Sequence, residues 1–586
     1  MRRFVPLLAA AAMAAPAWAL DQPEAATTRS AKAAGLAAPA RHFAVTAANP
    51  LAAAAGVEIL RAGGAAIDAA VAVQAVLGLV EPQSSGIAGG AFLLHWDGRE
   101  VQAFDGRETA PAAATPQLFL EPDGNALPMR EAVQSGLSTG TPGVLAMLAE
   151  AQRRHGRLPW ARLFAPAIRL AKQGFAVSPR LHELLAPETA LRADPQAGPY
   201  FFDAEGAPRP VGFVLKNPAY AAVLRSIAGQ GARAFYEGAV ADDIVRRVRG
   251  HARPGLLTAA DLAGYRAALR PPLCSEWRRY RICGFGPPSS GHLTLMQILG
   301  LLDTQPAART ARGLTADWLH AYAESAKLAF ADRAEYIGDP AFVTAPGGDW
   351  QTLLAPAYLK QRGALIGMRS MGIAAAGQPA AERRAFAPQA EQPEHGTSQI
   401  SIVDAQGRAV SMTTSVESAF GNRVMSDGGS GLAGGFMLNN QLTDFSRQPT
   451  GADGRPVANR VQAGKRPRSS MAPTLVFDPD GRLLLVAGSP GGPVIIHYVA
   501  KLITGTLAWG LSAQQAVDLP NFGDFNTGTL IVERGALPAD QLDALRERGH
   551  RIAETDLTSG LQVLMRTPDG WTGGADPRRE GVVSGE

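Results

Sequence analysis

The sequence predicts a large globular protein of the α+β class, in which helices and antiparallel strand pairs occupy different stretches of the chain. Helical periodicity dominates residues 49–80 and 142–270. Pairs of short alternating strands, separated by turn residues, recur around residues 97–98, 405–408 and 478–481. The chain has 586 residues, of which 46% are hydrophobic and 18% charged, so it contains enough apolar material for a substantial core.

The first 19 residues have the layout of a secretory signal peptide. Arg2 and Arg3 precede an apolar stretch over residues 4–15, and residues 17–19 (Ala-Trp-Ala) fit a cleavage site. The apolar stretch is too short to span a bilayer, and no later segment reaches the roughly 18 uninterrupted apolar residues that a span needs. We therefore expect residues 1–19 to be removed and the mature protein to be exported, periplasmic or secreted, with no membrane span.

Two helices are expected between Asn49 and Val80. Pro50 occupies a first turn, where proline is tolerated, and the glycines at residues 63–64 interrupt the helical pattern. A hairpin follows, with strands over residues 91–96 and 100–104.

Further helices and strands follow from the same patterns. Helices are expected over residues 143–154, 163–173, 239–249, 293–302 and 316–336. Strands are expected over residues 272–286 (two strands), 398–403, 409–416, 474–477 and 482–487, and an apolar helix over 493–507. Residues 340–394 are rich in Pro, Gly and Ala and are predicted to be loops, which makes them the best candidate for a mobile or cleaved segment.

The chain has two cysteines, Cys274 and Cys283. A two-residue turn at residues 278–279 would place them opposite each other on a hairpin, and an oxidising compartment would then allow a disulfide. Two buried thiols are the alternative. Two cysteines alone cannot form a structural zinc site.

Charge and known motifs exclude several functions. The net charge is +4, from 56 Lys and Arg against 52 Asp and Glu, and no basic run is long enough to indicate nucleic-acid binding. No Walker loop, HExxH motif or EF-hand loop is present. Residues 136–140 (GLSTG) match the pattern of a serine nucleophile elbow, but no convincing strand precedes Ser138, so a chance match is the preferred interpretation.

A stronger candidate for catalysis is Thr397. The Gly396-Thr397 bond lies just before a strand, and cleavage there would create an N-terminal threonine. Such a residue carries a hydroxyl nucleophile together with its own α-amine as base. The amine suits this role because its unperturbed pKa, about 7.7–8.0, lies near working pH. Considered alone, Thr397 could equally be an ordinary strand threonine.

Nine short blocks together resemble the γ-glutamyltransferases (γ-glutamyltranspeptidases), which are N-terminal-nucleophile hydrolases. The resemblance covers nearly the whole mature chain, in order and in rough spacing. The blocks are DGRETAP (105–111), GTPG (140–143), PPSSG (287–291), ADR (331–333), GTS (396–398), LNNQ (438–441), DFS (444–446), RPRSSM (466–471) and GSPGG (488–492).

The resemblance implies a fold and a maturation step. The expected fold is a four-layer αββα sandwich whose two central sheets contain strands from both subunits. Self-cleavage at Gly396-Thr397 would yield a large subunit (20–396) and a small subunit (397–586), which remain associated as a heterodimer.

The resemblance also implies roles for individual residues. Thr397 is the nucleophile, and Ser415, where the family usually has Thr, supplies a second hydroxyl beside it. The backbone N–H groups of Gly491 and Gly492 would stabilise the oxyanion. The remaining residues would bind the substrate. Its α-carboxylate would bind Arg107, Ser469 and Ser470, and its α-ammonium would bind Gln441 and Asp444. Thr413, on the return strand, and Glu417, just after it, are also expected to bind the substrate.

The chain departs from the family pattern in three places. Glu417 replaces the usual Asn, which adds negative charge beside Asp444 and could change the preferred acyl group. Residues 421–435 form a longer, more Gly-rich segment than usual. Residues 447–465 correspond to a loop that covers the pocket in many members but lack its frequent aromatic residue.

These features imply an enzyme that transfers or hydrolyses γ-glutamyl groups through an acyl-enzyme on Thr397, with glutathione as the expected donor and water, amino acids or peptides as acceptors. Neither a metal nor an organic cofactor is expected to be needed. The alternatives are a related acylase acting on cephalosporin or glutaryl amides, which Glu417 keeps open, and an exported binding protein that does not cleave itself.

Overall fold

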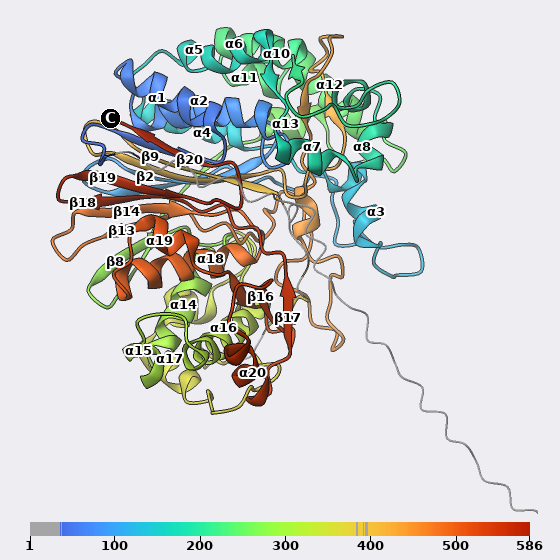
Figure 1. Cartoon of the computed structure of the whole chain (residues 1–586). Coiled ribbons are helices and arrows are strands. Elements are labelled where there is room, and N and C mark those ends of the chain that lie inside the picture. The colour runs from blue at the N-terminus through green and yellow to red at the C-terminus, as the bar shows by residue number, and fades with distance from the viewer. Residues whose placement is uncertain (1–35, 37, 382–384, 391, 393–395) are drawn as a thin grey trace, which may run out of the picture.

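The computed structural model describes residues 36, 38–381, 385–390, 392 and 396–586 (Figure 1). The predicted signal peptide lies outside the described residues. Across the described part of the chain, helices that could cross a bilayer are absent, since none combines sufficient length with sufficient hydropathy.

Two antiparallel sheets form the centre of the molecule. The order of the seven-stranded sheet is β20 (Val582–Gly585), β1 (Ala44–Ala47), β9 (Thr397–Val403), β10 (Ala409–Ser415), β2 (Gly90–Trp96), β3 (Val101–Asp105) and β6 (Ala268–Arg270). The order of the six-stranded sheet is β19 (Gly570–Ala575), β18 (Gln562–Thr567), β14 (Leu483–Gly488), β13 (Thr474–Phe477), β8 (Tyr280–Gly284) and β7 (Leu273–Trp277).

The sheets pack face to face, and helices cover both outer faces (Figure 1). Strands β9 and β10 of one sheet contact β14 and β18 of the other. Helix α2 (Ala66–Val80) packs on β9 and β10, and helix α18 (Val494–Ile503) packs on β14. The predicted four-layer αββα sandwich is confirmed.

The remaining helices divide between the two outer layers (Figure 1). On the side of the seven-stranded sheet lie α1 (Pro50–Arg61), α4 (Val144–His155), α5 (Trp160–Leu163), α6 (Ala165–Gln173), α7 (Pro179–Leu185), α8 (Thr189–Ala193), α10 (Pro218–Gln230), α11 (Arg233–Tyr236), α12 (Ala239–Arg249) and α13 (Ala259–Gly264). Helix α9 (Ala197–Phe201) contacts α8, and α3 (Met129–Val133) lies beside the sandwich. On the other side lie α14 (Gly291–Leu302), α15 (Pro306–Thr310), α16 (Ala316–Tyr336), α17 (Pro356–Gly363), α19 (Ala513–Asp518) and α20 (Ala539–Glu547).

Smaller strands complete the described chain. They are β4 (Phe175–Ala176), β5 (Val214–Leu215), β11 (Met425–Ser426), β12 (Phe436–Met437), β15 (Phe522–Asp524), β16 (Leu530–Glu533) and β17 (Ile552–Thr555).

Each sheet contains strands from both sides of the Gly396-Thr397 bond. In the seven-stranded sheet, β9 pairs with β1, and β10 pairs with β2. In the six-stranded sheet, β13 pairs with β8. All residues of β9 and β10 are buried, as expected for strands covered on both faces. If the chain were cut after residue 396, each sheet would therefore still contain strands from both fragments.

Local signals place most of the predicted elements correctly. The side chain of Asn49 caps α1 by accepting a 2.9 Å hydrogen bond from the backbone N–H of Leu51, and Pro50 begins the helix. The break at Gly63 separates α1 from α2, as predicted, and it has the positive φ of 86° that glycine tolerates.

The structure also distinguishes between a disulfide and two buried thiols for the two cysteines. Cys274 of β7 lies opposite Cys283 of β8 in the antiparallel register, and the two form a disulfide. The prediction of a hairpin at this position is confirmed.

The segment 340–394 contains more structure than the sequence predicts. Helix α17 lies within it, and its side chains anchor it to α16. The hydroxyl of Tyr358 donates a 2.7 Å hydrogen bond to Asp332, and the guanidinium of Arg362 lies 3.4 Å from the same carboxylate. The helix is missed by periodicity because polar contacts with α16, rather than an apolar stripe, hold it in place.

Candidate active site

The first residue of β9 and the last residue of β10 define the site. Thr397 and Ser415 are directly paired in the antiparallel register of these strands. Their hydroxyls lie 3.3 Å apart, with Thr397 Oγ1 as donor. The alternating pattern of the two strands and the turn at residues 404–408 therefore suffice to bring the two hydroxyls together.

The Gly396-Thr397 peptide bond is intact in this structure, and Ser415 also contacts it. The Ser415 hydroxyl donates a 2.5 Å hydrogen bond to the carbonyl oxygen of Gly396 and accepts one of 2.8 Å from the backbone N–H of Glu417. A donor on this carbonyl would stabilise the negative charge that develops there when a neighbouring hydroxyl attacks. The arrangement thus suits attack by Thr397 on its own preceding peptide bond.

Glycine is required at residue 396. Its φ is +106°, in the region that side chains disfavour. A Cβ placed there would come within 2.6 Å of the carbonyl oxygen of Glu417 and within 2.9 Å of the backbone of Ser418. The backbone therefore approaches the end of β10 closely at the scissile bond.

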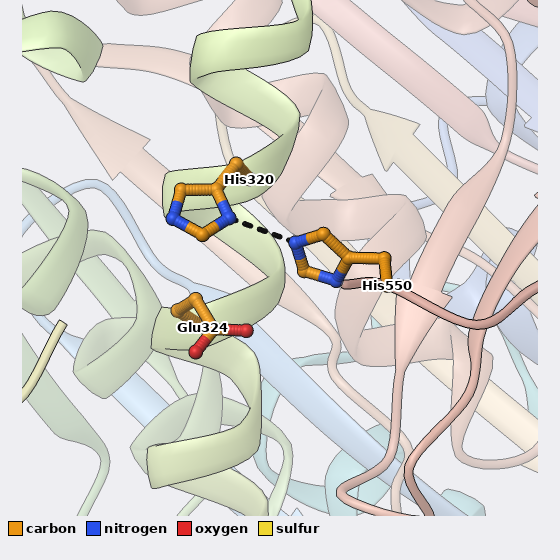
Figure 2. A group of neighbouring side chains, drawn as sticks. All are labelled: His320, Glu324 and His550. Atoms are coloured by element: carbon orange, nitrogen blue, oxygen red, sulfur yellow. Dashed lines mark hydrogen bonds between the residues drawn. The ribbon is translucent and has the colours of Figure 1, made fainter. Parts of the chain in front are cut away.

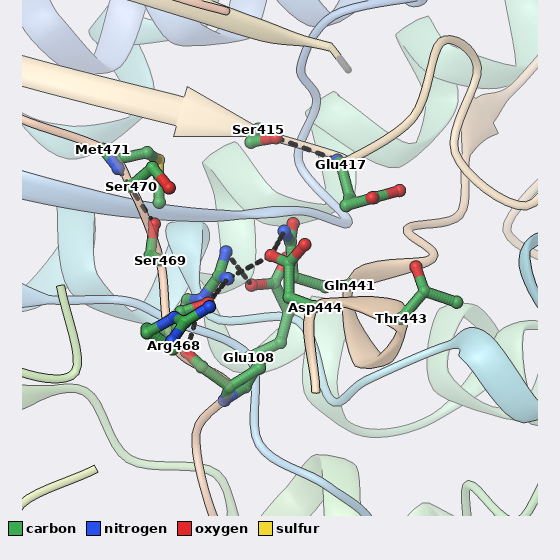
Figure 3. A network of polar contacts seen from close by, with 12 residues as sticks. Glu108, Ser415, Glu417, Gln441, Thr443, Asp444, Arg468, Ser469, Ser470 and Met471 are labelled. Carbon is green, nitrogen blue, oxygen red and sulfur yellow. Dashed lines mark hydrogen bonds and ion pairs between the residues drawn. The ribbon is translucent and has the colours of Figure 1, made fainter. Parts of the chain in front are cut away.

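A small pocket opens beside these hydroxyls, and its wall is largely polar. Its lining consists of Arg107, Thr397, Ser415, Glu417, Gln441, Asp444, Ser469, Met471, Gly492 and Ile495. Figure 3 shows Ser415 and Glu417, at the end of β10, on one side of the site and Gln441 and Asp444, from a second segment, on the other.

An arginine-aspartate pair lies at the base of this pocket. The guanidinium of Arg107 is hydrogen-bonded to the carboxylate of Asp444 and also donates to the carbonyls of Pro467 (3.2 Å) and Arg468 (3.0 Å). Gln441 donates a 2.7 Å hydrogen bond to the same carboxylate. A cation and an anion side by side in a buried pocket are complementary to an α-amino acid group, which carries both charges.

Glu417 follows Ser415 at the end of β10, and its backbone has a positive φ of 80°. Its carboxylate lines the pocket and accepts a 2.6 Å hydrogen bond from Ser418 as well as one from the side chain of Asn440. The pocket therefore contains two carboxylates, from Glu417 and Asp444, where the family pattern leads one to expect a single carboxylate and an amide.

Gly491 and Gly492 occupy the loop between β14 and α18. Both have positive φ values, of 132° and 56°, and they directly precede the N-terminus of α18. Backbone N–H groups at such a point favour negative charge. Gly492 lines the pocket.

Four sequence-derived candidates do not line the pocket. Thr413 is fully buried, and its hydroxyl donates a 2.6 Å hydrogen bond to Gln399. The hydroxyl of Ser470 accepts a 2.7 Å hydrogen bond from Arg333. Ser138 is buried, and its hydroxyl donates to the backbone carbonyls of residues 133 and 135. Gly491 adjoins the lining residue Gly492 without itself lining the pocket.

Several residues that sequence reasoning did not select contribute to the site. Asn459, within the predicted covering loop, donates a 2.7 Å hydrogen bond to the carbonyl of Asp444 and accepts one of 2.8 Å from the N–H of Arg468. Arg579 donates a 3.1 Å hydrogen bond to the carbonyl of Thr397. The contact of Arg579 joins segments 182 residues apart, so no local motif could have indicated it.

Glu108 lies behind Arg107 and is completely buried. Its carboxylate is 3.9 Å from the guanidinium of Arg107. Burial raises the pKa of Glu108 to about 8, although Arg107 opposes the increase. Burial likewise raises the pKa of Asp444, again opposed by Arg107. The carboxyl group of Glu108, next to the pocket, is therefore mostly protonated and neutral at pH 7.

Glu108→Gln should change how stability depends on pH. In the unfolded chain Glu108 ionises near pH 4.5, whereas in the folded chain it stays protonated to about pH 8. Folding therefore binds a proton in this window, and the free energy of unfolding falls as the pH rises, by up to about 1.4 kcal/mol per unit. Glutamine does not titrate, so the Glu108→Gln variant should lack this fall in the free energy of unfolding. Denaturant unfolding from pH 5 to 9 should show the variant gaining stability relative to wild type, and parallel pH profiles would contradict the assignment.

Comparison with known proteins identifies the relatives of this chain. A sequence model described as Gamma-glutamyltranspeptidase matches residues 52–586. The chain is 35% identical over 535 residues to the "Glutathione hydrolase proenzyme" of Escherichia coli (strain K12), which covers 89% of this chain and 88% of the relative. It is also 34% identical to the "Acylase ACY 1 proenzyme" of Pseudomonas sp. (strain V22), over 91% of this chain and 92% of the relative.

Solved structures include both kinds of enzyme. A cephalosporin acylase from Bacillus halodurans superimposes with a TM-score of 0.80 at 28% identity, covering 95% of this chain and 97% of the acylase. A Helicobacter pylori gamma-glutamyltranspeptidase chain superimposes with a TM-score of 0.51 at 34% identity, covering 54% of this chain and 90% of that chain.

Proposed function

Because this chain belongs to the gamma-glutamyltranspeptidase family, we propose that it cleaves the γ-glutamyl amide bond of glutathione and related compounds. The observation that carries the proposal is the position of the Arg107–Asp444 pair in the same pocket as Thr397. This pair can bind the α-carboxylate and α-ammonium of a γ-glutamyl group, which leaves the γ-carbonyl to be placed near the hydroxyl.

Maturation would come first. The Thr397 hydroxyl attacks the carbonyl of Gly396, and Ser415 stabilises the developing oxyanion. Collapse of this intermediate breaks the C–N bond, which frees the Thr397 amine and leaves Gly396 as an ester on Thr397 Oγ1. Water then hydrolyses the ester, giving the Gly396 carboxylate and the free Thr397 hydroxyl. The products are the large subunit 20–396 and the small subunit 397–586. Both central sheets contain strands from the two parts, which supports a stable heterodimer. The relatives' names include "proenzyme", which is consistent with this step.

The reaction would use the same hydroxyl. Thr397 Oγ1 attacks the γ-amide carbonyl while its own α-amine accepts the proton. The N–H groups at Gly491 and Gly492 stabilise the oxyanion, and the amine product leaves with the proton. Water then cleaves the γ-glutamyl ester to give glutamate, or an amino acid or peptide takes the acyl group. None of these steps requires a metal or an organic cofactor.

The substrate would contact the base of the pocket through its charged head. Its α-carboxylate would bind Arg107 and Ser469, and its α-ammonium would bind Asp444 and Gln441. In this structure Ser469 Oγ accepts a 3.1 Å hydrogen bond from the N–H of Met471, so its hydroxyl proton remains available as a donor to a carboxylate. We further propose that the protein acts after export, with residues 1–19 removed.

A comparison of two substrates tests the function. The mature protein should hydrolyse a γ-glutamyl anilide, and it should hydrolyse a glutaryl anilide, which lacks the α-amino group, much more slowly. Cleavage of the glutaryl compound alone would overturn the proposal. The proposal would also be overturned if the chain cleaves itself at Gly396-Thr397 but hydrolyses neither anilide.

An acylase is the second candidate, which Glu417 keeps open because it departs from the family pattern and which the similarity to acylases favours. The structural similarity to a cephalosporin acylase and the sequence similarity to an acylase proenzyme agree with a pocket that could accept another acyl group. Two carboxylates in the pocket nevertheless favour a substrate with a positive charge over a glutaryl group.

Glu417→Asn should weaken this charge preference. Removing one carboxylate should lower the ratio of γ-glutamyl to glutaryl cleavage about 10-fold, mainly through a higher KM for the γ-glutamyl substrate. Steady-state kinetics with both substrates would measure the change. Glu417→Asp, which keeps the charge, serves as the matched control. An unchanged ratio in the Asn variant would show that Glu417 does not select the substrate.

A further inference from the structure

A second cluster of polar side chains lies on the opposite side of the six-stranded sheet, within the α16 layer. His320 and Glu324 are one turn apart on α16, and His550 follows α20 and faces them (Figure 2). One ligand atom from each of the three residues lies within 4.8 Å of the others. All three side chains are buried, and Glu324 is 0% exposed. None of them contributes to the pocket at Thr397.

The hydrogen bonds of His320 define which of its nitrogens is available. Its Nε2 lies 2.8 Å from the carbonyl oxygen of Gly367, which can only accept, so Nε2 carries the proton. The lone pair of its Nδ1 then points at Nε2 of His550, 2.8 Å away. A backbone carbonyl that fixes the far nitrogen of a histidine is the usual support for a metal-binding imidazole.

From this geometry we propose that His320, Glu324 and His550 bind a divalent transition-metal ion such as Zn²⁺. Two imidazoles and a carboxylate form a ligand set that suits zinc. His320 would coordinate through Nδ1, His550 through Nε2 after its proton shifts to Nδ1, and Glu324 through a carboxylate oxygen. The site is separate from the chemistry proposed at Thr397.

Binding an ion requires the two imidazole rings to turn, because their nitrogens now point at each other in a hydrogen bond. Two nitrogens about 2.0–2.1 Å from a tetrahedral zinc ion lie about 3.4 Å apart, so the 2.8 Å contact between His320 and His550 must widen by roughly 0.6 Å. Side-chain rotation can supply this change. His320 and Gly367 also line a cavity of about 460 Å³ that adjoins the cluster.

The charges around the cluster allow a cation. Glu324 forms a 2.6 Å ion pair with Lys327 and accepts a 2.8 Å hydrogen bond from the N–H of Met371. Lys327 also donates a 2.6 Å hydrogen bond to the hydroxyl of Ser370 and lies 3.8 Å from the carboxyl group of Asp524, so it keeps polar partners when Glu324 binds the ion.

The ligands come from two distant segments of the chain. His320 and Glu324 precede residue 396, whereas His550 follows it. Given the cleavage proposed above, the ion would join the large and small subunits at a point away from the central sheets. This bridging role rests on the proposed function, but metal binding itself does not.

Zinc binding to the chelator-stripped mature protein tests the proposal. Titration with Zn²⁺ against a chromophoric competitor should show one tight site per chain, and Co²⁺ at the same site should give the visible absorption of a low-symmetry complex. His320→Gln and His550→Gln should each weaken zinc binding at least about 10-fold. Glu324→Gln provides a third variant if either histidine change prevents folding.

A second histidine pair offers a matched control. His155 packs against His95 with ring centroids 4.5 Å apart, and its Nε2 contacts the side-chain oxygen of Gln102. His155→Gln should leave zinc affinity unchanged. A wild-type protein that binds no zinc, or zinc binding that survives in both His320→Gln and His550→Gln, would overturn the metal site. Neither readout depends on γ-glutamyl activity, so failure of the function and failure of the metal site are distinguishable.

Discussion

Thr397→Ala should leave the chain as a single polypeptide and reduce γ-glutamyl cleavage by at least about 1,000-fold. The change removes the hydroxyl that attacks both the Gly396 carbonyl and the substrate, while Ser415 and the pocket remain in place. Denaturing gel electrophoresis should show two fragments for wild type, near two-thirds and one-third of the chain, and one band for the variant. N-terminal sequencing of the shorter wild-type fragment should begin at Thr397.

Thr397→Ser is the matched control, because it keeps a hydroxyl on the same atom. It should still process itself and retain measurable activity. The mechanism would be contradicted by a short fragment that begins at another residue, or by wild-type activity in the alanine variant. A single band in both wild type and Thr397→Ala would instead support the non-cleaving binding protein.

Arg107→Lys should lower kcat/KM for a γ-glutamyl substrate about 100-fold, chiefly by raising KM. The guanidinium of Arg107 reaches Asp444 and the carbonyls of Pro467 and Arg468 at once, and these contacts fix its orientation. A lysine keeps the charge that Asp444 needs but cannot offer a planar pair of donors. Steady-state kinetics with the γ-glutamyl anilide measures the loss.

The control for this change is Arg423→Lys. Arg423 is also buried and forms two hydrogen bonds to a carboxylate, that of Glu188, at 3.1 and 3.0 Å, but it does not line the pocket. Its variant should keep kcat/KM within about 2-fold of wild type. A similar loss in both variants would indicate a general effect on the fold, and no loss in Arg107→Lys would contradict carboxylate binding by Arg107.

The local parts of the fold could be predicted from the sequence because their signals are local. The alternation of residues 397–416 and its central turn define the β9–β10 hairpin and hence the pairing of Thr397 with Ser415. A glycine-rich stretch between a strand and an apolar helix likewise places Gly491 and Gly492 at a helix N-terminus. Helix α17 could not be predicted in this way, because contacts with Asp332 hold it.

Sequence alone determined which residue types this chain could use for catalysis, and the family blocks indicated their roles. The tertiary structure decided which of them share a pocket: it placed Arg107 beside Asp444, 337 residues away, and directed Thr413 and Ser470 elsewhere. It also brought His550 to His320 across 230 residues. The reason is physical, since periodicity and turn chemistry act over a few residues, whereas these contacts exist only after two sheets and their helices have packed together.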